Sequence, residues 1–354
     1  MNSPYETFST IDTSNSVIDA DSQAALKAAT VIETTLIPHT AFQNAGAKLD
    51  QCFRYAAARL EPICVPVIGE SRTGKSRSLE VFSNKHPMVR TPTGMLIPVL
   101  RVITPSGPTK GALAETMLAA MGDEKFAAGT LPQKTIRLFK LLKACDTRVV
   151  IIDEFQQFID KASERVAYET ADWLKNLVDE AKVALVVAGL PSCLKVLDYN
   201  EQLDGRFLAP VVLPRFDWAT EDSRDEFVAI LSAFEETMGQ HFKLPALASD
   251  EMSFRFYCAS GGLIGYLSKM LRLAVWNADE QKCDSIDLPA LQIAYEGAVR
   301  KIDLDAAEID PFSPEFSITP SVELLMKVHK IGTREAQGAN QRGGPQRKPK
   351  LDKI

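Results

Sequence analysis

The sequence predicts a doubly wound α/β domain that is followed by a smaller all-helical domain. Apolar runs without polar alternation recur in the first part of the chain, which is typical of parallel strands buried on both faces. Helical patterns separate these runs, as in α/β proteins. Beyond Pro214 the helical patterns continue without further strands. We therefore expect a parallel sheet core and a C-terminal helical unit.

The composition is that of an ordinary soluble protein. The 354 residues are 45% hydrophobic and 24% charged. A net charge of −6 excludes a surface coated with positive potential, so any contact with nucleic acid must be local. The six cysteines are scattered singly without metal-binding spacing, and free thiols indicate a reducing cytoplasm. No run approaches the ~18 apolar residues of a membrane span, so we expect no membrane partner.

The first domain is expected at residues 23–215, after a polar segment at residues 1–22 that we interpret as a flexible arm. A helical pattern over residues 41–60 leads into the first strand. We expect strands at Ile63–Ile68, Ile97–Ile103, Arg148–Ile152, Val183–Ala188 and Val211–Leu213. The helices between them are expected at Lys75–Asn84, Thr109–Met121, Gln133–Lys143 and Ser163–Glu180.

The second domain is expected at residues 216–305, and residues 306–354 form a C-terminal extension. Amphipathic patterns predict the helices of this domain at Ser223–Gly239, Asp250–Ser260, Gly262–Ala278 and Leu288–Ile302. The extension holds a short helix near Val322–His329. From Thr333 onward basic residues outnumber acidic ones and apolar residues are few, which predicts a disordered basic tail.

One loop carries the clearest chemical signal. The residues Gly69-Glu70-Ser71-Arg72-Thr73-Gly74-Lys75-Ser76 match G-x-x-x-x-G-K-[ST] directly after the first strand. The two glycines let backbone N–H groups face phosphates, Lys75 adds a positive charge, and Ser76 offers a hydroxyl to Mg²⁺. The helix that starts at Lys75, with Arg77 in its first turn, directs its positive end toward the same anion. We predict that this loop binds ATP with Mg²⁺.

The second signal is the apolar run Val149–Ile152, which ends in Asp153-Glu154. Ligands bind at the carboxyl ends of strands in open α/β sheets, so this tip is expected at the phosphate site. We assign Asp153 to the Mg²⁺ shell, through water, and Glu154 to the water that attacks the γ-phosphate. The alternative is a strand that ends in two solvated acids. A water-activating glutamate favours hydrolysis over transfer to a small molecule.

Two further residues are candidates near the strand ends. Ser192 follows the fourth strand, where related ATPases place a polar sensor of the γ-phosphate; otherwise it is a turn or cap serine. Arg206 precedes the last strand, where an arginine finger completes a neighbour's site. The alternative for Arg206 is an ion pair within the subunit, for example with Asp204, and Arg215 is then the next candidate finger.

This constellation resembles an AAA+ ATPase, and more narrowly the transposition ATPases TniB and TnsC. The narrower resemblance rests on Leu36-Ile37-Pro38-His39, Ile97-Pro98-Val99, Ile151-Ile152-Asp153-Glu154-Phe155-Gln156, Val187-Ala188-Gly189-Leu190-Pro191 and Gln202-Leu203…Arg206-Phe207. It covers about residues 35–305 and implies that the helical domain is a lid on the nucleotide. AAA+ lids commonly carry an arginine after a glycine pair. Here Gly265 stands at that position, which favours a slow, switch-like ATPase.

The resemblance implies that ATP-bound subunits assemble as a ring or helical filament around duplex DNA. The segments expected to face the DNA contain Thr109, Lys110, Lys134 and Arg137. Lys110 at a helix start can pair with a phosphate while Thr109 donates beside it; the alternative is a solvated surface lysine. Contacts to phosphates make binding sequence-tolerant and salt-sensitive. The basic tail is a candidate for contact with DNA or with a transposase.

Three functions are compatible with these residues. The first is an ATP-dependent regulator of bacterial DNA transposition, which links a target-selection protein, TniQ-like or DNA-binding, to the transposase and disassembles on hydrolysis. The second is another oligomeric AAA+ ATPase of the origin-recognition or loader type. The third is a signalling NTPase that acts on protein partners alone. The sequence leaves open the number of subunits and the way in which targets are chosen, by a protein or by an RNA-guided complex.

Overall fold

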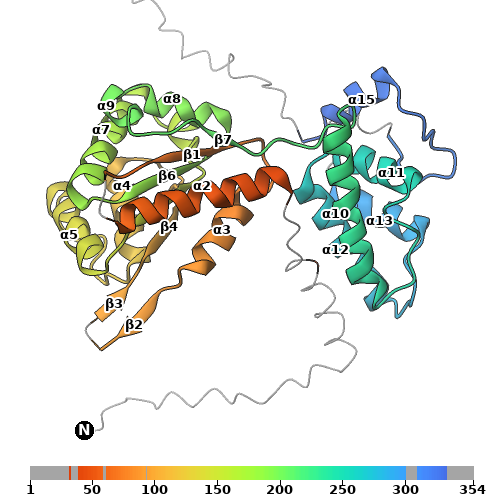
Figure 1. Ribbon diagram of the computed structural model, residues 1–354, viewed down its shortest axis with the longest axis horizontal. Helices are drawn as coiled ribbons and strands as arrows, with labels where there is room; N and C mark the ends of the chain where they lie inside the picture. The colour runs from red at the N-terminus through yellow and green to blue at the C-terminus, as the bar shows by residue number, and fades with distance from the viewer. Residues whose placement is uncertain (1–31, 33–38, 59–60, 93, 300–308, 333–354) are drawn as a thin grey trace, which may run out of the picture.

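The computed structural model of the chain describes residue 32 and residues 39–58, 61–92, 94–299 and 309–332. The expected arm at residues 1–22 and the basic tail from Thr333 lie outside the described residues. The described chain forms an α/β lobe and a helical lobe, and the segment after β7 connects them (Figure 1).

A parallel five-stranded sheet lies at the centre of the α/β lobe. Its strands are β1 (Val65–Ile68), β4 (Val99–Ile103), β5 (Val149–Asp153), β6 (Ala184–Gly189) and β7 (Val211–Val212). The strand order is β4-β5-β6-β1-β7, and every neighbouring pair is parallel. This confirms the parallel sheet that the sequence predicts. Because the strands are parallel, the carboxyl ends of β1, β5 and β6 meet at the same edge.

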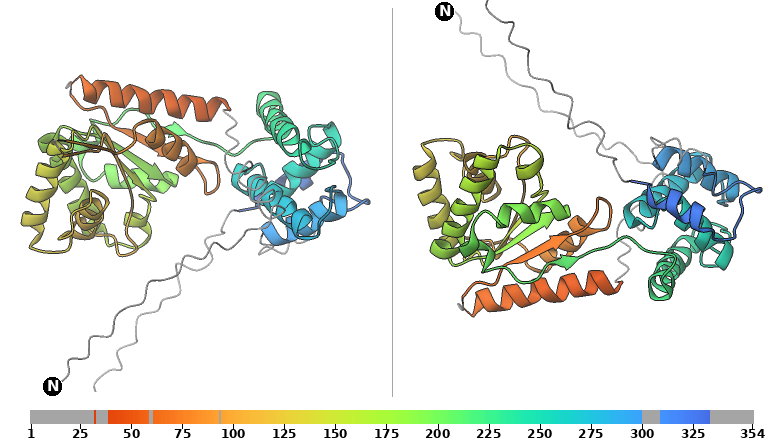
Figure 2. Two further views of the ribbon diagram at one scale, coloured as in Figure 1. Left: turned by 90° about the horizontal axis from the view of Figure 1, so that it is seen from below. Right: turned by 90° about the horizontal axis from the view of Figure 1, so that it is seen from above.

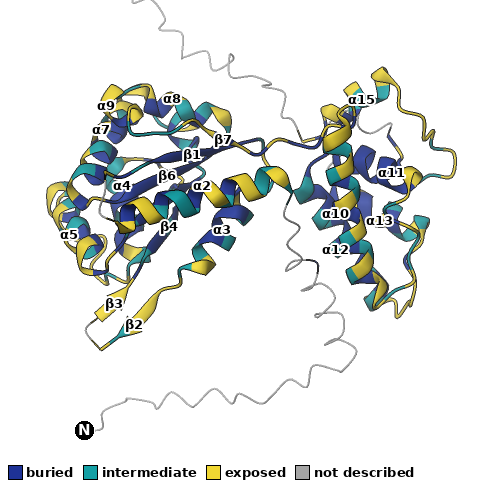
Figure 3. Cartoon of the chain, viewed as in Figure 1, coloured by how far each residue is buried: buried dark blue, intermediate teal, exposed yellow. Residues whose placement is uncertain are grey.

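Helices cover both faces of the sheet (Figures 1 and 2). The helices α2 (Thr40–Ala57) and α3 (Lys75–Lys85) pack on one face, and α4 (Lys110–Ala120), α5 (Leu131–Ala144) and α7 (Glu164–Ala181) pack on the other. Alternate residues of β5 pack on opposite faces of the sheet. Val149 and Ile151 join the cluster under α2 and α3, whereas Val150 and Ile152 join the cluster under α4, α5 and α7. All four are fully buried, so the strand needs no polar alternation. In Figure 3 the neighbouring strands β1 and β6 are likewise drawn as buried.

The second strand differs from its expected bounds. β4 begins at Val99 rather than Ile97, and an antiparallel hairpin of β2 (Val89–Thr91) and β3 (Gly94–Leu96) precedes it. Pro98 has no N–H to give to a ladder, and its carbonyl accepts from the N–H groups of Arg148 and Val149 instead. Short segments complete the lobe: α6 (Gln157–Asp160), a 3₁₀ turn η1 (Pro191–Cys193), α8 (Leu194–Leu197) and α9 (Glu201–Asp204).

The helical lobe contains the four helices that the sequence predicts. They are α10 (Glu221–Gly239), α11 (Asp250–Ser260), α12 (Ile264–Glu280) and α13 (Leu288–Ala298). The third starts at Ile264 rather than Gly262, because Gly261 and Gly262 both have positive φ angles, 63° and 70°, that end α11. Residues 300–302 of the fourth expected helix lie outside the described residues.

The described part of the C-terminal extension packs on the helical lobe. It contains α15 (Val322–His329), and Phe312, Val328 and Ile331 belong to the lobe's hydrophobic core. Arg255 of α11 donates from Nη1 to the carbonyl of Pro311 at 2.6 Å. Ile32, far away in sequence, is buried in the same core. Among the described helices, none is long and apolar enough to cross a membrane.

Candidate nucleotide site

The loop between β1 and α3 has the backbone of a phosphate cradle. Gly69 follows β1, and a Cβ at this position would overlap the carbonyl oxygen of Leu213. Gly74, directly before α3, has a φ angle of 95°, which favours glycine. Arg72 between them also has a positive φ angle, 70°. The two glycines of the motif therefore stand where the tight turn and the close chain approach require them.

Lys75 is buried in the first turn of α3. Its Nζ donates to the carbonyl oxygens of Gly69 at 2.8 Å and Glu70 at 2.5 Å. Burial lowers the pKa of Lys75, and the carboxylates of Glu154 and Asp153 act in the opposite direction. Carbonyl oxygens carry partial charge, so they compensate a buried ammonium less well than an anion would. The loop thus offers a site where a phosphate group is favoured.

Asp153 ends β5 and is 2% exposed. Its Oδ2 lies 3.1 Å from Nη2 of Arg101 in β4, and its Oδ1 accepts the N–H of Glu154 at 2.9 Å. Thr104 donates from its hydroxyl to the carbonyl of Asp153 at 2.9 Å. These bonds fix the carboxylate and the carbonyl of Asp153 at the end of β5. Arg101 could not be recognised from the sequence, because a single arginine inside an apolar run carries no sign of its partner.

Glu154 follows Asp153 with a φ angle of 56°, which is uncommon for a residue with a side chain. This turn ends the strand, and the N–H of Phe155 donates to the carbonyl of Ala188 in β6 at 2.8 Å. The carboxylate of Glu154 accepts a hydrogen bond from Nε2 of Gln156 at 2.7 Å. Among the charged groups around Lys75, Glu154 does most to raise the pKa of the lysine.

The described residues fit a magnesium nucleotide. Ser76 is exposed in the first turn of α3, where its hydroxyl is free to coordinate a cation. Asp153 supplies a carboxylate from the end of β5, at the same edge of the sheet, and hard oxygen donors are what Mg²⁺ prefers. The described chain has no cluster of three His, Cys, Asp or Glu residues that could hold a metal alone. A cation here would be coordinated by Ser76, Asp153 and the phosphates together.

The helical lobe touches this loop directly. The N–H of Gly265 in α12 donates to the carbonyl of Arg72 at 2.9 Å. A Cβ at Gly265 would lie 2.8 Å from Cβ of Arg72. The guanidinium of Arg72 lies over the ring of Tyr266, 4.3 Å from its centroid. An arginine at position 265 would therefore displace the loop, which is the physical reason for the glycine that the sequence analysis noted there.

Arg215 joins three parts of the chain. It is 7% exposed and forms a two-bond ion pair with Glu70 of the phosphate loop. Its Nη1 donates to the carbonyls of Gly261, at the end of α11, and His329, at the end of α15, at 3.1 and 2.8 Å. Arg215 thus connects the loop to the helical lobe and to the C-terminal extension. To act as an arginine finger in a neighbour's site, it would have to break these bonds.

We expect Arg215→Met to destabilise the protein by about 3 kcal/mol, because the carbonyls of Gly261 and His329 lose their donor and Glu70 loses its partner. The thermal unfolding midpoint should fall by roughly 5 °C or more. Arg165→Met is the matched control, since the Arg165 side chain is 87% exposed and pairs only at the surface. Equal midpoints for the two variants would contradict this role of Arg215.

The same ion pair predicts a pH dependence. The hydrogen bond from Arg215 holds the pKa of Glu70 below its usual value of 4.5. A carboxyl group with a lowered pKa stabilises the fold above its unfolded pKa and loses that contribution as the pH falls through its folded pKa. The midpoint difference between wild type and Arg215→Met should therefore be full above pH 4.5 and shrink below it. A difference that stays constant in acid would contradict the pair's contribution.

Arg206 and Ser192, the two remaining candidates from the sequence, take part in none of the contacts described above. Arg206 lies between α9 and β7, and its guanidinium pairs with Asp179 at 2.6 Å and with Glu61 at 3.0 Å. These partners differ from Asp204, which the sequence analysis considered. As a finger, Arg206 would have to exchange them for a neighbour's phosphate, and that role stays a prediction. Ser192 lies in η1, beyond the end of β6.

The candidate DNA contacts are all engaged within the subunit. Thr109 caps α4, with its Oγ1 accepting from the N–H of Ala112 at 3.1 Å. Lys110 pairs with Glu169 at 3.0 Å, Lys134 with Glu115 at 2.6 Å, and Arg137 with Asp123 at 2.6 Å. Lys134 is buried, so its pair contributes to the packing of α5 on α4. The side chains of Lys110 and Arg137 are about equally accessible, and that of Lys134 is less so.

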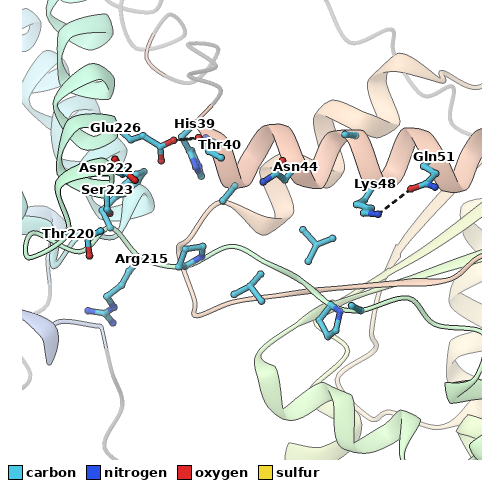
Figure 4. A pocket seen from close by; sticks show the side chains of 18 of the residues that line it. His39, Thr40, Asn44, Lys48, Gln51, Arg215, Thr220, Asp222, Ser223 and Glu226 are labelled. Atoms are coloured by element: carbon cyan, nitrogen blue, oxygen red, sulfur yellow. Dashed lines mark hydrogen bonds between the residues drawn. The ribbon is translucent and has the colours of Figure 1, made fainter.

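A groove of about 1540 Å³ lies between α2, β7 and the start of α10 (Figure 4). Arg215 lines it, and so does His39, whose ring meets that of Phe216 edge-on at 5.2 Å. Burial lowers the pKa of His39, and the charge of Glu226 opposes this. The N–H of Thr40 donates to Glu226 of α10 at 2.9 Å, which ties α2 to the helical lobe. No pattern in the sequence predicts this groove.

Comparisons with known proteins bear on the family and the fold of the chain. Residues 27–218, more than half of the chain, match the family model described as bacterial TniB protein. The ORC2 protein of Aeropyrum pernix, solved as ADPNP–ADP complexes, has 15% identity and a TM-score of 0.55 over 76% of this chain and 71% of that one.

Two further solved structures have a similar fold. Cdc6p of Pyrobaculum aerophilum has 12% identity and a TM-score of 0.53 over 77% of this chain and 72% of its own. The ORC1 protein of A. pernix in complex with DNA has 16% identity and a TM-score of 0.51 over 75% and 68%. These likenesses show the AAA+ type of α/β fold. A search of curated proteins found no significant match.

Proposed function

We propose that this chain, which belongs to the bacterial TniB family, is an ATP-dependent regulator of DNA transposition. In this proposal ATP-bound subunits assemble on target duplex DNA in the cytoplasm. The assembly links a target-selection protein to the transposase, and hydrolysis of ATP takes it apart. The observation that carries the proposal is the buried Lys75 in a glycine-bracketed loop, with Asp153 and Glu154 beside it, in a chain of this family.

The residues divide the chemistry between them. The N–H groups of the loop and Lys75 bind the phosphates, and Ser76 and Asp153 hold Mg²⁺. When bound, Mg²⁺ neutralises charge that develops on the phosphate oxygens. Glu154 orients and polarises the attacking water. Arg206 of a neighbouring subunit would supply the last positive charge. We place the nucleoside at the end of the groove near His39 and Phe216.

The contact between lobes supports a switch rather than a fast motor. Gly265 and Arg72 bring α12 against the loop without offering a cation from the helix. Through its hydrogen bonds, Arg215 couples the position of the loop to the positions of the helical lobe and α15. We propose that hydrolysis is slow and that the nucleotide state sets the arrangement of the lobes. The ORC proteins of similar fold that were solved with ADPNP and ADP, or with DNA, support this proposal.

Electron microscopy tests the proposal most directly. Purified protein is mixed with plain duplex DNA and either a non-hydrolysable ATP analogue or ADP. We expect rings or filaments on DNA with the analogue and their loss with ADP, with salt-sensitive and sequence-tolerant binding. Nucleotide-dependent oligomers that ignore DNA would overturn the proposal and favour a signalling NTPase. Stable assembly at one DNA sequence alone would favour the origin-recognition type.

A further inference from the structure

Gln156 lies two residues beyond Glu154, and both ends of its side-chain amide are used. It is 7% exposed. Its Nε2 donates to the carboxylate of Glu154 at 2.7 Å, and its Oε1 accepts the N–H of Leu190 at 3.2 Å. A carboxylate can only accept, and a backbone N–H can only donate, so the two partners determine the orientation of the amide. Gln156 therefore bridges the end of β5 to the segment that follows β6.

The end of β6 is shaped to receive this side chain. Gly189 is the last residue of β6, and a Cβ at this position would overlap Oε1 of Gln156. Any other residue at position 189 would push the amide away from Glu154. The amide thus occupies the space in which a polar side chain from the tip of β6 would stand. The carbonyl of Gly189 also accepts the N–H of Gly69, so the same strand end holds the start of the phosphate loop.

Charge explains why Glu154 needs such a partner. Glu154 directly follows β5, and Lys75 starts the helix that follows β1, so their opposite charges lie at the same edge of the sheet and attract each other. If the carboxylate were free to turn, it could pair with the ammonium that is needed by the phosphates, and it would then not face the water. The hydrogen bond from Gln156 engages one carboxylate oxygen of Glu154, so the carboxylate is not free to turn.

We propose that Gln156 is a positioning residue of the hydrolytic site: it holds the Glu154 carboxylate in place and performs, from the segment after β5, the task expected of a polar side chain at the end of β6. This inference rests on the proposed ATP hydrolysis. Gln156 acts through Glu154 and contacts no phosphate, so its loss should slow turnover and leave nucleotide binding unchanged.

The test uses two variants of the full chain, with ATP turnover measured with and without duplex DNA. Gln156→Met keeps the length of the side chain and removes both hydrogen bonds. Gln156→Glu keeps an acceptor for Leu190 and removes the donor to Glu154. For both we expect kcat to fall about tenfold to a hundredfold, and KM and the Kd of a non-hydrolysable analogue to change less than about twofold. In a Glu154→Gln background, Gln156→Met should have no further effect.

The outcomes separate this inference from the proposed function. If wild-type protein does not hydrolyse ATP under any condition, the proposed function and the inference both fail. If wild type hydrolyses ATP and Gln156→Met has the same kcat, the inference alone fails. Wild-type turnover in Gln156→Glu with a slow Gln156→Met would show that the Leu190 bond matters rather than the Glu154 bond. An equal loss of analogue binding would show a general role in folding, and it would also overturn the inference.

Discussion

Lys75→Ala is expected to weaken ATP binding by about a hundredfold or more and to abolish nucleotide-dependent assembly. The ammonium is buried beside the loop carbonyls, so in the bound state its bonds to phosphate would be charge-assisted and shielded from water. Removing it also takes away a positive charge that acts on Glu154, whereas Asp153 keeps its ion pair with Arg101. Calorimetric titration with a non-hydrolysable analogue measures the loss, and light scattering with DNA measures assembly.

Lys140→Ala is the matched control for this prediction. Lys140 is an exposed lysine of α5, so its removal changes the net charge equally without touching the loop. The control should bind ATP and DNA as wild type does. If Lys75→Ala kept wild-type affinity for the analogue, the nucleotide would have to bind elsewhere, for example deeper in the groove beside α2.

The sequence predicts the loop and the acidic strand end well because their signals are local. The loop motif constrains consecutive residues, and its glycines report backbone conformations that the structure contains at Gly74 and a close approach at Gly69. Asp153 and Glu154 follow an apolar run whose burial can be read directly from its residues. Parallel strands then place both signals at one edge of the sheet.

The roles of Gln156 and Arg101 could not be predicted in the same way. Each depends on a partner that is distant in the chain, Leu190 for Gln156 and Asp153 for Arg101. Gly189 is the one signal that could have indicated Gln156. A glycine at the tip of a buried strand indicates that something else fills the space of its side chain, and here that is the Gln156 amide.

The candidate DNA contacts illustrate the same limit. The helical pattern places Lys110 at the start of α4 and Lys134 in the first turn of α5, as the structure has them. Whether such a cation is free for a phosphate depends on which acid the neighbouring helix presents. The packing of α4, α5 and α7 brings Glu169 to Lys110 and Glu115 to Lys134. Binding of DNA through Lys110 would therefore compete with an ion pair at the surface.

Glu154→Gln is expected to lower kcat for ATP hydrolysis by about a hundredfold or more and to leave ATP affinity intact. The amide has the shape of the carboxylate, and its oxygen can still accept from Gln156, so the turn after β5 should persist. It cannot take a proton or polarise water as a carboxylate does. Because hydrolysis is the step proposed to end the assembly, ATP should then hold the variant on DNA much longer than wild type.

Two measurements decide this prediction. Phosphate release gives kcat, and the lifetime of the DNA complex after a chase with competitor DNA gives the disassembly rate. Glu180→Gln, an exposed carboxylate near the end of α7, is the matched control and should behave as wild type in both. Slow hydrolysis with an unchanged lifetime would separate Glu154 from disassembly. A Glu154→Gln protein that binds ATP but fails to assemble would mean that the carboxylate supports the ATP-bound arrangement itself rather than the attack of water.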